Sequence, residues 1–275
     1  MRPCVVSALL SVAASCLSGI TIAGAQTVPS SCHAIAQNLP KAEFAVLGTA
    51  PPKVLLAALG RDEVKISYVH HSTYRIESPE GVTAATDYSG FSGEGPPPRI
   101  ATMNKAHSTH FTNVPDPAIE TVLRGWNPEG SPARHAVTIG DLYVRNVPTD
   151  IRTSGGGVEA DGNSIFVFEV AGLCIGHLGH LHHRLTDEDF AEIGRLDIVM
   201  VPVDGSWTLS QAGMGETVQR LRSQIVLPMH RFAGPIERFL DRLPGFAVER
   251  RPERSLTVSM RTLPERPTVI ILDGV

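Results

Sequence analysis

From Val64 onward, apolar residues recur at every second position, a spacing typical of half-buried β-strands. This pattern predicts strands at residues 64–68, 74–76 and 82–87, and short apolar stretches predict further strands at 100–103, 135–139, 142–147, 197–203, 224–230, 256–260 and 268–272. A longer apolar run at 165–175 predicts a β-hairpin that turns at 171–172, where an alanine and a glycine interrupt it. Short strands therefore dominate the chain from Val64 onward.

Helical patterns occur mainly in the second half of the chain. Helices are predicted at residues 117–124, 186–196, 210–222 and 236–243, with shorter helical pieces at 34–36 and 54–59. The helix that begins at Thr186 carries acidic residues in its first turn, where they complement the helix dipole. Strands that alternate with such helices predict an α/β fold of two packed sheets with helices on the outside, an αββα sandwich.

The N-terminus has the pattern of a secretory signal peptide. Arg2 precedes an uncharged apolar stretch at 5–22, and an A-x-A cleavage site follows at 23–25. We expect a signal peptide at 1–25, an N-terminal lead at 26–63, one domain at 64–275, and a periplasmic or secreted protein. No later apolar run is long enough to span a bilayer, so no membrane association is predicted after cleavage.

Composition and charge narrow the class of partner. The chain has 275 residues, and its formal net charge of -4 gives no basis for binding nucleic acid or an anionic membrane. The expected partner is a small-molecule substrate, and the sequence leaves the oligomeric state open. Cleavage would leave only Cys32 and Cys174. Since Cys174 lies in an apolar strand, a buried free thiol is the simpler interpretation, although pairing with Cys32 stays open.

Histidines follow the predicted strands. Four of the eleven lie in the eight residues 176–183, directly after the 165–175 hairpin. His107 and His110 come just after the strand at 100–103, and His230 ends the strand at 224–230. Neutral imidazole is a common metal ligand, and loops held by a rigid sheet often carry ligands. A metal site is therefore predicted, although a polar loop with incidental histidines is the alternative.

Several stretches, in the right order, resemble the metallo-β-lactamase fold superfamily, and within it the L-ascorbate-6-phosphate lactonase-like hydrolases. The matching stretches are residues 66–77, Asp87, 104–110, 177–183, and 197–205 together with 227–230. The resemblance covers about 64–230 and implies a sandwich of the metallo-β-lactamase type. It also implies a metal-dependent hydrolase.

The metal motifs of this chain depart from the family pattern. In the H-x-H-x-D-H loop, Lys105 replaces the first histidine and Thr109 replaces the aspartate, while His107 and His110 remain. His180 stands where the family has a bridging aspartate. By this comparison one metal site retains only His107, with Asp150 near the position of a missing histidine. The other retains His110 and His230 and gains His180.

Three imidazoles and a water complete a catalytic zinc site. We therefore expect about one Zn²⁺ per chain, held by His110, His180 and His230, with His107 and Asp150 as candidate ligands of a weaker site. Other divalent metals are open alternatives. The candidate catalytic residues are Lys105, Asp150 and His107. Lys105 either stabilises an oxyanion or turns outward to solvent.

Other residues keep two interpretations. His71 lines the pocket or caps a hairpin, and Trp126 and Trp207 frame the pocket or pack in loops. His182 is expected to be exposed to solvent. Structural or supporting roles are expected for His177, Asp87 and His183.

Two functions are compatible with these residues. The first is an exported hydrolase that uses a metal-bound hydroxide on an ester, lactone, amide or phosphodiester bond. The second is a non-catalytic periplasmic metal- or ligand-binding protein on a decayed fold. The sequence favours the hydrolase, because decay would scatter losses rather than place a new ligand-type residue at position 180.

Overall fold

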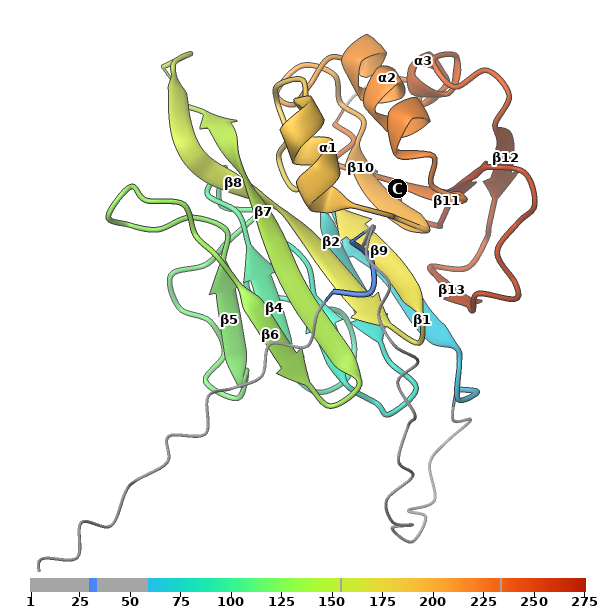
Figure 1. The fold of residues 1–275 in the computed structure, drawn as a ribbon, viewed down its shortest axis with the longest axis horizontal. Coiled ribbons are helices and arrows are strands. Elements are labelled where there is room, and N and C mark those ends of the chain that lie inside the picture. Colours follow the sequence, from blue (N-terminus) through green and yellow to red (C-terminus); the bar gives the residue numbers. More distant parts are fainter. Residues whose placement is uncertain (1–29, 34–58, 154, 233) are drawn as a thin grey trace, which may run out of the picture.

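The computed structural model describes residues 30–33, 59–153, 155–232 and 234–275 (Figure 1). The expected signal peptide and the helical piece at 34–36 lie outside these residues, as does all but the last residue of the piece at 54–59. Among the described residues, no helix is both long and apolar enough to cross a membrane.

Two β-sheets form the body of the molecule. The six-stranded sheet has the order β13-β1-β2-β3-β4-β5. Its strands are β13 (Ser255–Val258), β1 (Val64–His70), β2 (Thr73–Glu77), β3 (Thr83–Ala85), β4 (Ile100–Met103) and β5 (Thr121–Arg124). The eight-stranded sheet has the order β12-β14-β11-β10-β9-β8-β7-β6. Its strands are β12 (Ala247–Arg250), β14 (Thr268–Ile271), β11 (Ile225–Met229), β10 (Ile198–Pro202), β9 (Leu173–His177), β8 (Val158–Val170), β7 (Leu142–Arg152) and β6 (Ala136–Ile139).

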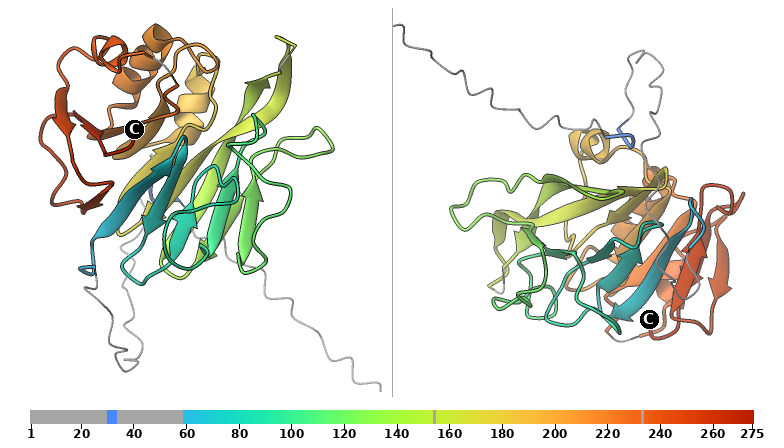
Figure 2. Two further views of the ribbon diagram at one scale, coloured as in Figure 1. Left: turned by 180° about the vertical axis from the view of Figure 1, so that it is seen from behind. Right: turned by 90° about the horizontal axis from the view of Figure 1, so that it is seen from below.

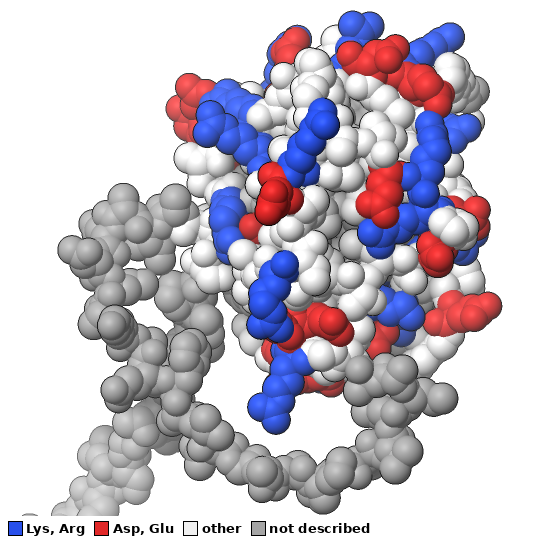
Figure 3. All heavy atoms as spheres, turned by 90° about the vertical axis from the view of Figure 1, so that its right-hand side faces the viewer, with Lys and Arg blue, Asp and Glu red and all other residues white. Residues whose placement is uncertain are grey.

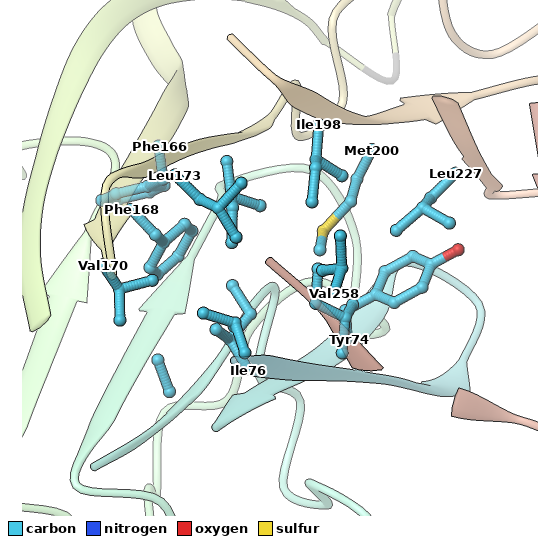
Figure 4. Packing of buried hydrophobic residues seen from close by; sticks show 14 of the residues in the cluster. Tyr74, Ile76, Phe166, Phe168, Val170, Leu173, Ile198, Met200, Leu227 and Val258 are labelled. Atoms are coloured by element: carbon cyan, nitrogen blue, oxygen red, sulfur yellow. The ribbon is translucent and has the colours of Figure 1, made fainter. Parts of the chain in front are cut away.

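The main hydrophobic core lies between the two sheets. Alternate residues of β2, such as Tyr74 and Ile76, face alternate residues of β8, such as Phe166 and Phe168 (Figure 4). This period-two pairing is what the apolar spacing predicted. The fully buried Tyr74 also belongs to this core, and its hydroxyl donates a hydrogen bond of 2.8 Å to the carbonyl oxygen of Pro228.

Three helices pack on the outer face of the eight-stranded sheet (Figures 1 and 2). They are α1 (Asp187–Ile193), α2 (Gln211–Leu221) and α3 (Glu237–Leu240). Thr186 caps α1 through reciprocal hydrogen bonds with Asp189. The predicted αββα sandwich is thus confirmed, with the described helices on one sheet.

The prediction of a helix at 117–124 is wrong. Residues 121–124 form β5, which pairs in parallel with β4. The β-branched Thr121 and Val122 favour this extended conformation, and pairing with an existing strand decides the outcome. Loop residues, not a described helix, cover this part of the six-stranded sheet: Phe111, Ile119 and Trp126 belong to a small cluster with Ala101 and Met103.

A disulfide bond joins Cys32 to Cys174, with 5.8 Å between their Cα atoms. The interpretation of Cys174 as a free buried thiol was therefore wrong. The same N-terminal segment is held by Glu169, whose carboxylate accepts hydrogen bonds from Ser30 and Ser31 and pairs with Arg145. These contacts fix residues 30–33 against β8 and β9.

Strand direction brings several chain ends to one edge of the sandwich. Strands β9, β10 and β11 run parallel to one another, and β3 runs parallel to β4. Strand β1 points the same way as β3, because each is antiparallel to β2. The loops that follow these strands therefore gather at the edge where their carboxyl ends meet.

Basic and acidic side chains are interspersed on the molecular face in Figure 3.

Candidate metal centre

Four histidines meet where these strands end. One ring nitrogen from each of His71, His107, His110 and His230 lies within 4.8 Å of the corresponding nitrogen of every other. His71 lies in the turn between β1 and β2, His107 and His110 follow β4, and His230 directly follows β11. The two sheets therefore both contribute to the group.

Each of three rings has one nitrogen, called here the outward nitrogen, that is held by a hydrogen bond to a residue outside the histidine group. Nδ1 of His110 lies 2.6 Å from Asp87 Oδ2, and both side chains are fully buried. Nδ1 of His230 lies 3.0 Å from Asp204 Oδ1. Nδ1 of His107 lies 2.8 Å from the Thr109 hydroxyl. Such partners orient an imidazole and leave its Nε2 atom free to bind a metal.

Nε2 of His107 and Nε2 of His230 lie 3.4 Å apart, whereas other inward nitrogens lack partners among the described residues. Nε2 of His71, Nε2 of His110 and both ring nitrogens of His180 are buried without a hydrogen bond. Native proteins rarely leave buried polar groups unsatisfied, and a bound ion is a standard explanation. Imidazole nitrogens are also ordinary donors to divalent transition metals. The residues therefore fit a metal ion.

His180 lies beside this group. Its ring centroid is 5.3 Å from that of His107, 5.1 Å from that of His110 and 4.9 Å from that of His230. The backbone amide of His180 donates to Asn163 Oδ1 at 2.7 Å. The preceding Gly179 has a φ of 59°, and a Cβ atom there would lie 2.5 Å from the same Asn163 oxygen. Glycine is thus required for this approach to β8.

Three of the rings, those of His71, His107 and His180, have a pKa well below the ordinary value. Burial, and then repulsion from neighbouring imidazoles, lowers the pKa of His71 from 6.5 to about 3 and that of His107 to about 4. The same causes lower the pKa of His180 to about 2. Metal binding requires an unprotonated imidazole, so these three rings can accept a cation at neutral pH without first releasing protons.

Asp87 is the buried anion of the site. Burial would raise the pKa of its carboxyl group, but the adjacent rings of His110 and His177 and its hydrogen bonds lower the pKa to about 2. One of these bonds comes from Asn104, whose Nδ2 donates to Asp87 Oδ1 at 2.9 Å. Asn104 Oδ1 in turn accepts from the amide of Ser164 at 2.7 Å. The loop at 104–110 is thereby hydrogen-bonded to residues of both sheets.

Two of the predicted site residues lie outside the histidine group. Asp150 is on β7, where its Oδ1 accepts a hydrogen bond of 3.2 Å from the amide of Asp161. The ammonium of Lys105 pairs with Glu159 at 2.5 Å, and both side chains are about two-fifths exposed. This placement matches the outward alternative for Lys105. Their catalytic and ligand roles stay predictions.

One supporting residue of the site, Asp204, was not predicted, and His71 had two interpretations. Asp204 was not singled out, although it lies in the matched stretch 197–205 just after β10. His71 belongs to the histidine group, a placement that neither of its two interpretations, pocket lining or hairpin capping, included. His182, expected to be exposed, is 8% exposed and therefore buried. His177 has the expected structural role, since its Nε2 lies 2.8 Å from the carbonyl oxygen of Ser72.

A cavity of about 390 Å³ adjoins the histidines. Its lining consists of Ala106, His107, Arg152, Thr153, Gly156, His180, Ser206 and Trp207. Trp207 is 60% exposed, so its ring is available for contact with a bound molecule. Trp126 instead packs against Phe111, with 5.5 Å between the ring centroids.

The two-sheet sandwich and the histidines at its strand ends define the class of metallo-β-lactamase-fold proteins. A family model described as "Beta-lactamase superfamily domain" matches residues 65–230, more than half of the chain. The chain belongs to this superfamily. The narrower resemblance to ascorbate-6-phosphate lactonases stays a prediction. A comparison with curated proteins found no match.

Solved structures share the fold. One is a proposed Zn-dependent hydrolase of the metallo-β-lactamase superfamily from Thermotoga maritima, with 23% identity and a TM-score of 0.56 over 76% of this chain and 98% of that one. Another is a proposed metal-dependent hydrolase from Parabacteroides distasonis, with 16% identity and a TM-score of 0.52 over 66% and 89% of the two chains. The metallo-β-lactamase-fold protein YhfI from Bacillus subtilis has 10% identity and a TM-score of 0.51 over 78% and 98%.

Proposed function

We propose that the protein is an exported metal-dependent hydrolase. The observation that carries this proposal is the buried histidine group. Asp87, Asp204 and Thr109 hold its outward nitrogens, while Nε2 of His71 and Nε2 of His110 are buried with no partner among the described residues. A purely structural cluster of imidazoles would leave costly unsatisfied groups in the interior. The superfamily supports hydrolysis as the reaction class.

The proposed cofactor is about one Zn²⁺ per chain. A bound Zn²⁺ acts as a Lewis acid and makes hydroxide available from water near neutral pH. The histidines hold and orient the ion, and the two aspartates fix the ring orientations. His107 and His180 border the cavity, so a substrate would reach the histidine group from that side.

The proposed substrate is a small molecule with an ester, lactone, amide or phosphodiester bond. The cavity offers the exposed ring of Trp207 for stacking and the guanidinium of Arg152 for an anionic group. Arg152 also donates a hydrogen bond of 3.1 Å to the carbonyl oxygen of Ser206, which holds the arginine at the cavity rim. The lining thus suits a compact substrate that is partly apolar.

Export is proposed from the signal-like segment at 1–25. The disulfide between Cys32 and Cys174 supports it, because structural disulfides are concentrated in oxidising compartments. The intact mass of protein from its native host, after reduction, should correspond to a chain that begins at Gln26. Recovery of a soluble cytoplasmic protein that retains Met1 would overturn the proposal.

A substrate panel tests the hydrolase proposal. Protein stripped with a chelator and protein reloaded with Zn²⁺ would be assayed on chromogenic esters, lactones, amides and phosphodiesters. We expect hydrolysis only after reloading, and no recovery in His110→Ala. His33→Ala is the matched control, because His33 is exposed and bonds the carbonyl oxygen of Glu192 instead. Metal binding without any hydrolysis would favour the non-catalytic alternative.

A further inference from the structure

We propose that His71 is a metal ligand and that the site presents only imidazole nitrogens to the ion. This inference rests on the proposed metal-dependent function and specifies the class of metal. The superfamily resemblance at 66–77 gave His71 no ligand role, and the carboxylates beside the site are oriented away from an ion. The donor set therefore differs from the one that the family motif implies.

His71 is placed like a ligand. Its ring centroid lies 4.2 Å from that of His230, 5.3 Å from that of His110 and 5.5 Å from that of His107. These are the same three rings that His180 contacts. Its Nε2 atom is buried and has no hydrogen-bond partner among the described residues. A ring nitrogen in that position would be satisfied by binding the ion that its neighbours hold.

The backbone of His71 adopts a conformation that is unfavourable for residues with a side chain. Its φ is 43°, and His230 and Asp87 also have positive φ values, of 53° and 40°. Such conformations persist only where the surrounding structure enforces them, and they concentrate at functional sites. Three of them within one group of contacting residues therefore support a functional role for the turn that carries His71.

The two carboxylates near the site are already engaged. Asp87 uses Oδ2 for His110 and Oδ1 for Asn104. Asp204 uses Oδ1 for His230, and its Oδ2 accepts from the amides of Ser206 and Trp207 at 2.9 and 2.6 Å. The family's metal-loop aspartate is Thr109, whose hydroxyl contacts the far nitrogen of His107. No carboxylate of the described group thus faces the inward nitrogens.

This donor set selects among metals. Imidazole suits Zn²⁺, Cu²⁺ and Ni²⁺, whereas Mn²⁺ and Mg²⁺ prefer carboxylate, carbonyl and water oxygens. The site should therefore retain Zn²⁺ or Cu²⁺ and release Mn²⁺. The competing interpretation is that His71 only packs, because its ring also contacts Phe232 at 5.1 Å between centroids.

Equilibrium metal binding distinguishes these interpretations without any assay of activity. The Zn²⁺ affinity of stripped protein would be measured by competition with a chromophoric chelator for wild type, His71→Gln and His70→Gln. His70 is the matched control, since it adjoins His71 in sequence but stacks on Phe91. We expect Zn²⁺ affinity to fall at least ~10-fold in His71→Gln, the lower range for loss of a supporting group at a metal site. His70→Gln should bind like wild type.

A measurement on the wild type protects the test against a misfolded variant. The electron paramagnetic resonance spectrum of the Cu²⁺-loaded protein should show nitrogen couplings that require at least four imidazoles, and Mn²⁺ should not survive dialysis. Unchanged affinity in His71→Gln, or retention of Mn²⁺, would overturn the inference while leaving the hydrolase proposal intact. If wild type binds none of these metals, the proposed function fails as well.

Discussion

The backbone amide of His230 donates a hydrogen bond of 2.7 Å to the carbonyl oxygen of His71. The first residue ends a strand of the eight-stranded sheet, and the second lies in a turn of the six-stranded sheet. One bond therefore joins the sheets at the place where the imidazoles meet. It also links two residues whose backbones are both left-handed, with φ values of 43° and 53°.

Removal of the His180 ring should weaken metal binding. Both of its nitrogens are buried without a partner in the part of the chain that the structure describes, and its ring contacts three rings of the group. We expect about one metal ion per wild-type chain after dialysis, and a loss of metal in His180→Ala. Elemental analysis is the measurement. His182→Ala is the control, and equal metal content in the two variants would contradict a ligand role for His180.

Asp204 should matter more to the metal than Asp150. Asp204 orients His230, whereas Asp150 accepts a hydrogen bond from a backbone amide on the neighbouring strand. Asp204→Asn should lower Zn²⁺ affinity by ~10–100-fold, the usual effect of losing such a supporting partner. Asp150→Asn should leave the affinity unchanged. A large loss in Asp150→Asn, measured by chelator competition, would instead support the ligand role predicted from the sequence.

Lys105 should be dispensable for turnover. Its ammonium is neutralised by Glu159 at the partly exposed edge of the site, so it is not directed at the imidazoles. Lys105→Ala is expected to keep its metal and to change kcat less than ~3-fold, well below the cost of losing an oxyanion donor. Steady-state kinetics on any hydrolysed substrate would check this. A loss near ~100-fold would show that the side chain turns inward during catalysis.

Metal-free protein should lose stability as the pH falls from 6.5 towards about 4. The folded-state pKa values of His71 and His107 are about 3 and about 4, below the ordinary value of 6.5. In this window the unfolded chain binds protons that the folded chain excludes, so the free energy of unfolding decreases with decreasing pH. The lowered pKa of Asp87 acts only below its ordinary value of 3.8 and leaves the window unaffected.

Urea unfolding in the presence of chelator, at about pH 7.5 and about pH 5, measures this effect. The midpoint should be lower at the acidic pH. A double variant, His71→Gln with His107→Gln, should show a smaller difference because it lacks two of the rings with a lowered pKa. Identical wild-type midpoints at the two pH values would rule out this linkage.

Trp207 should contribute to substrate binding rather than to the chemical step. It is 60% exposed in the lining of the cavity, and its backbone amide is held by Asp204. Trp207→Ala is expected to raise KM by ~5–10-fold at little cost in kcat, in line with an aromatic contact of about 1 kcal/mol. Phe91→Ala, an exposed aromatic residue elsewhere, is the control. An unchanged KM would exclude the contact.

The strand pattern carried most of the information about the fold. Alternation at Ile66, Tyr74 and Ile76 predicts both the strands and their buried face, because the period of a strand is two residues. The helix predicted at 117–124 failed, since the pairing of β5 with β4 is a long-range contact that local propensity does not report.

The site was predictable only in part. His107, His110 and His230 follow strands whose carboxyl ends meet, so the topology brings them together as expected. Asp150 was chosen because it lies near the position where the family pattern expects a histidine. In the structure it lies on β7, outside the histidine group. The roles of Asp204 and His71 depend on how each imidazole ring is oriented, that is, on which neighbour each ring nitrogen faces. Packing between the two sheets fixes the orientation of the rings, and the amino-acid sequence does not predict it.

The histidine group is assembled from segments that span most of the domain, from the turn after β1 to the end of β11. Its geometry therefore exists only after both sheets have formed and docked. Contacts between such distant segments form late, since the entropy of closing the intervening chain opposes them. Uptake of metal should accordingly be the final event of maturation. The molar ratio of metal to protein in a preparation would then report the fraction of chains that have completed their folding.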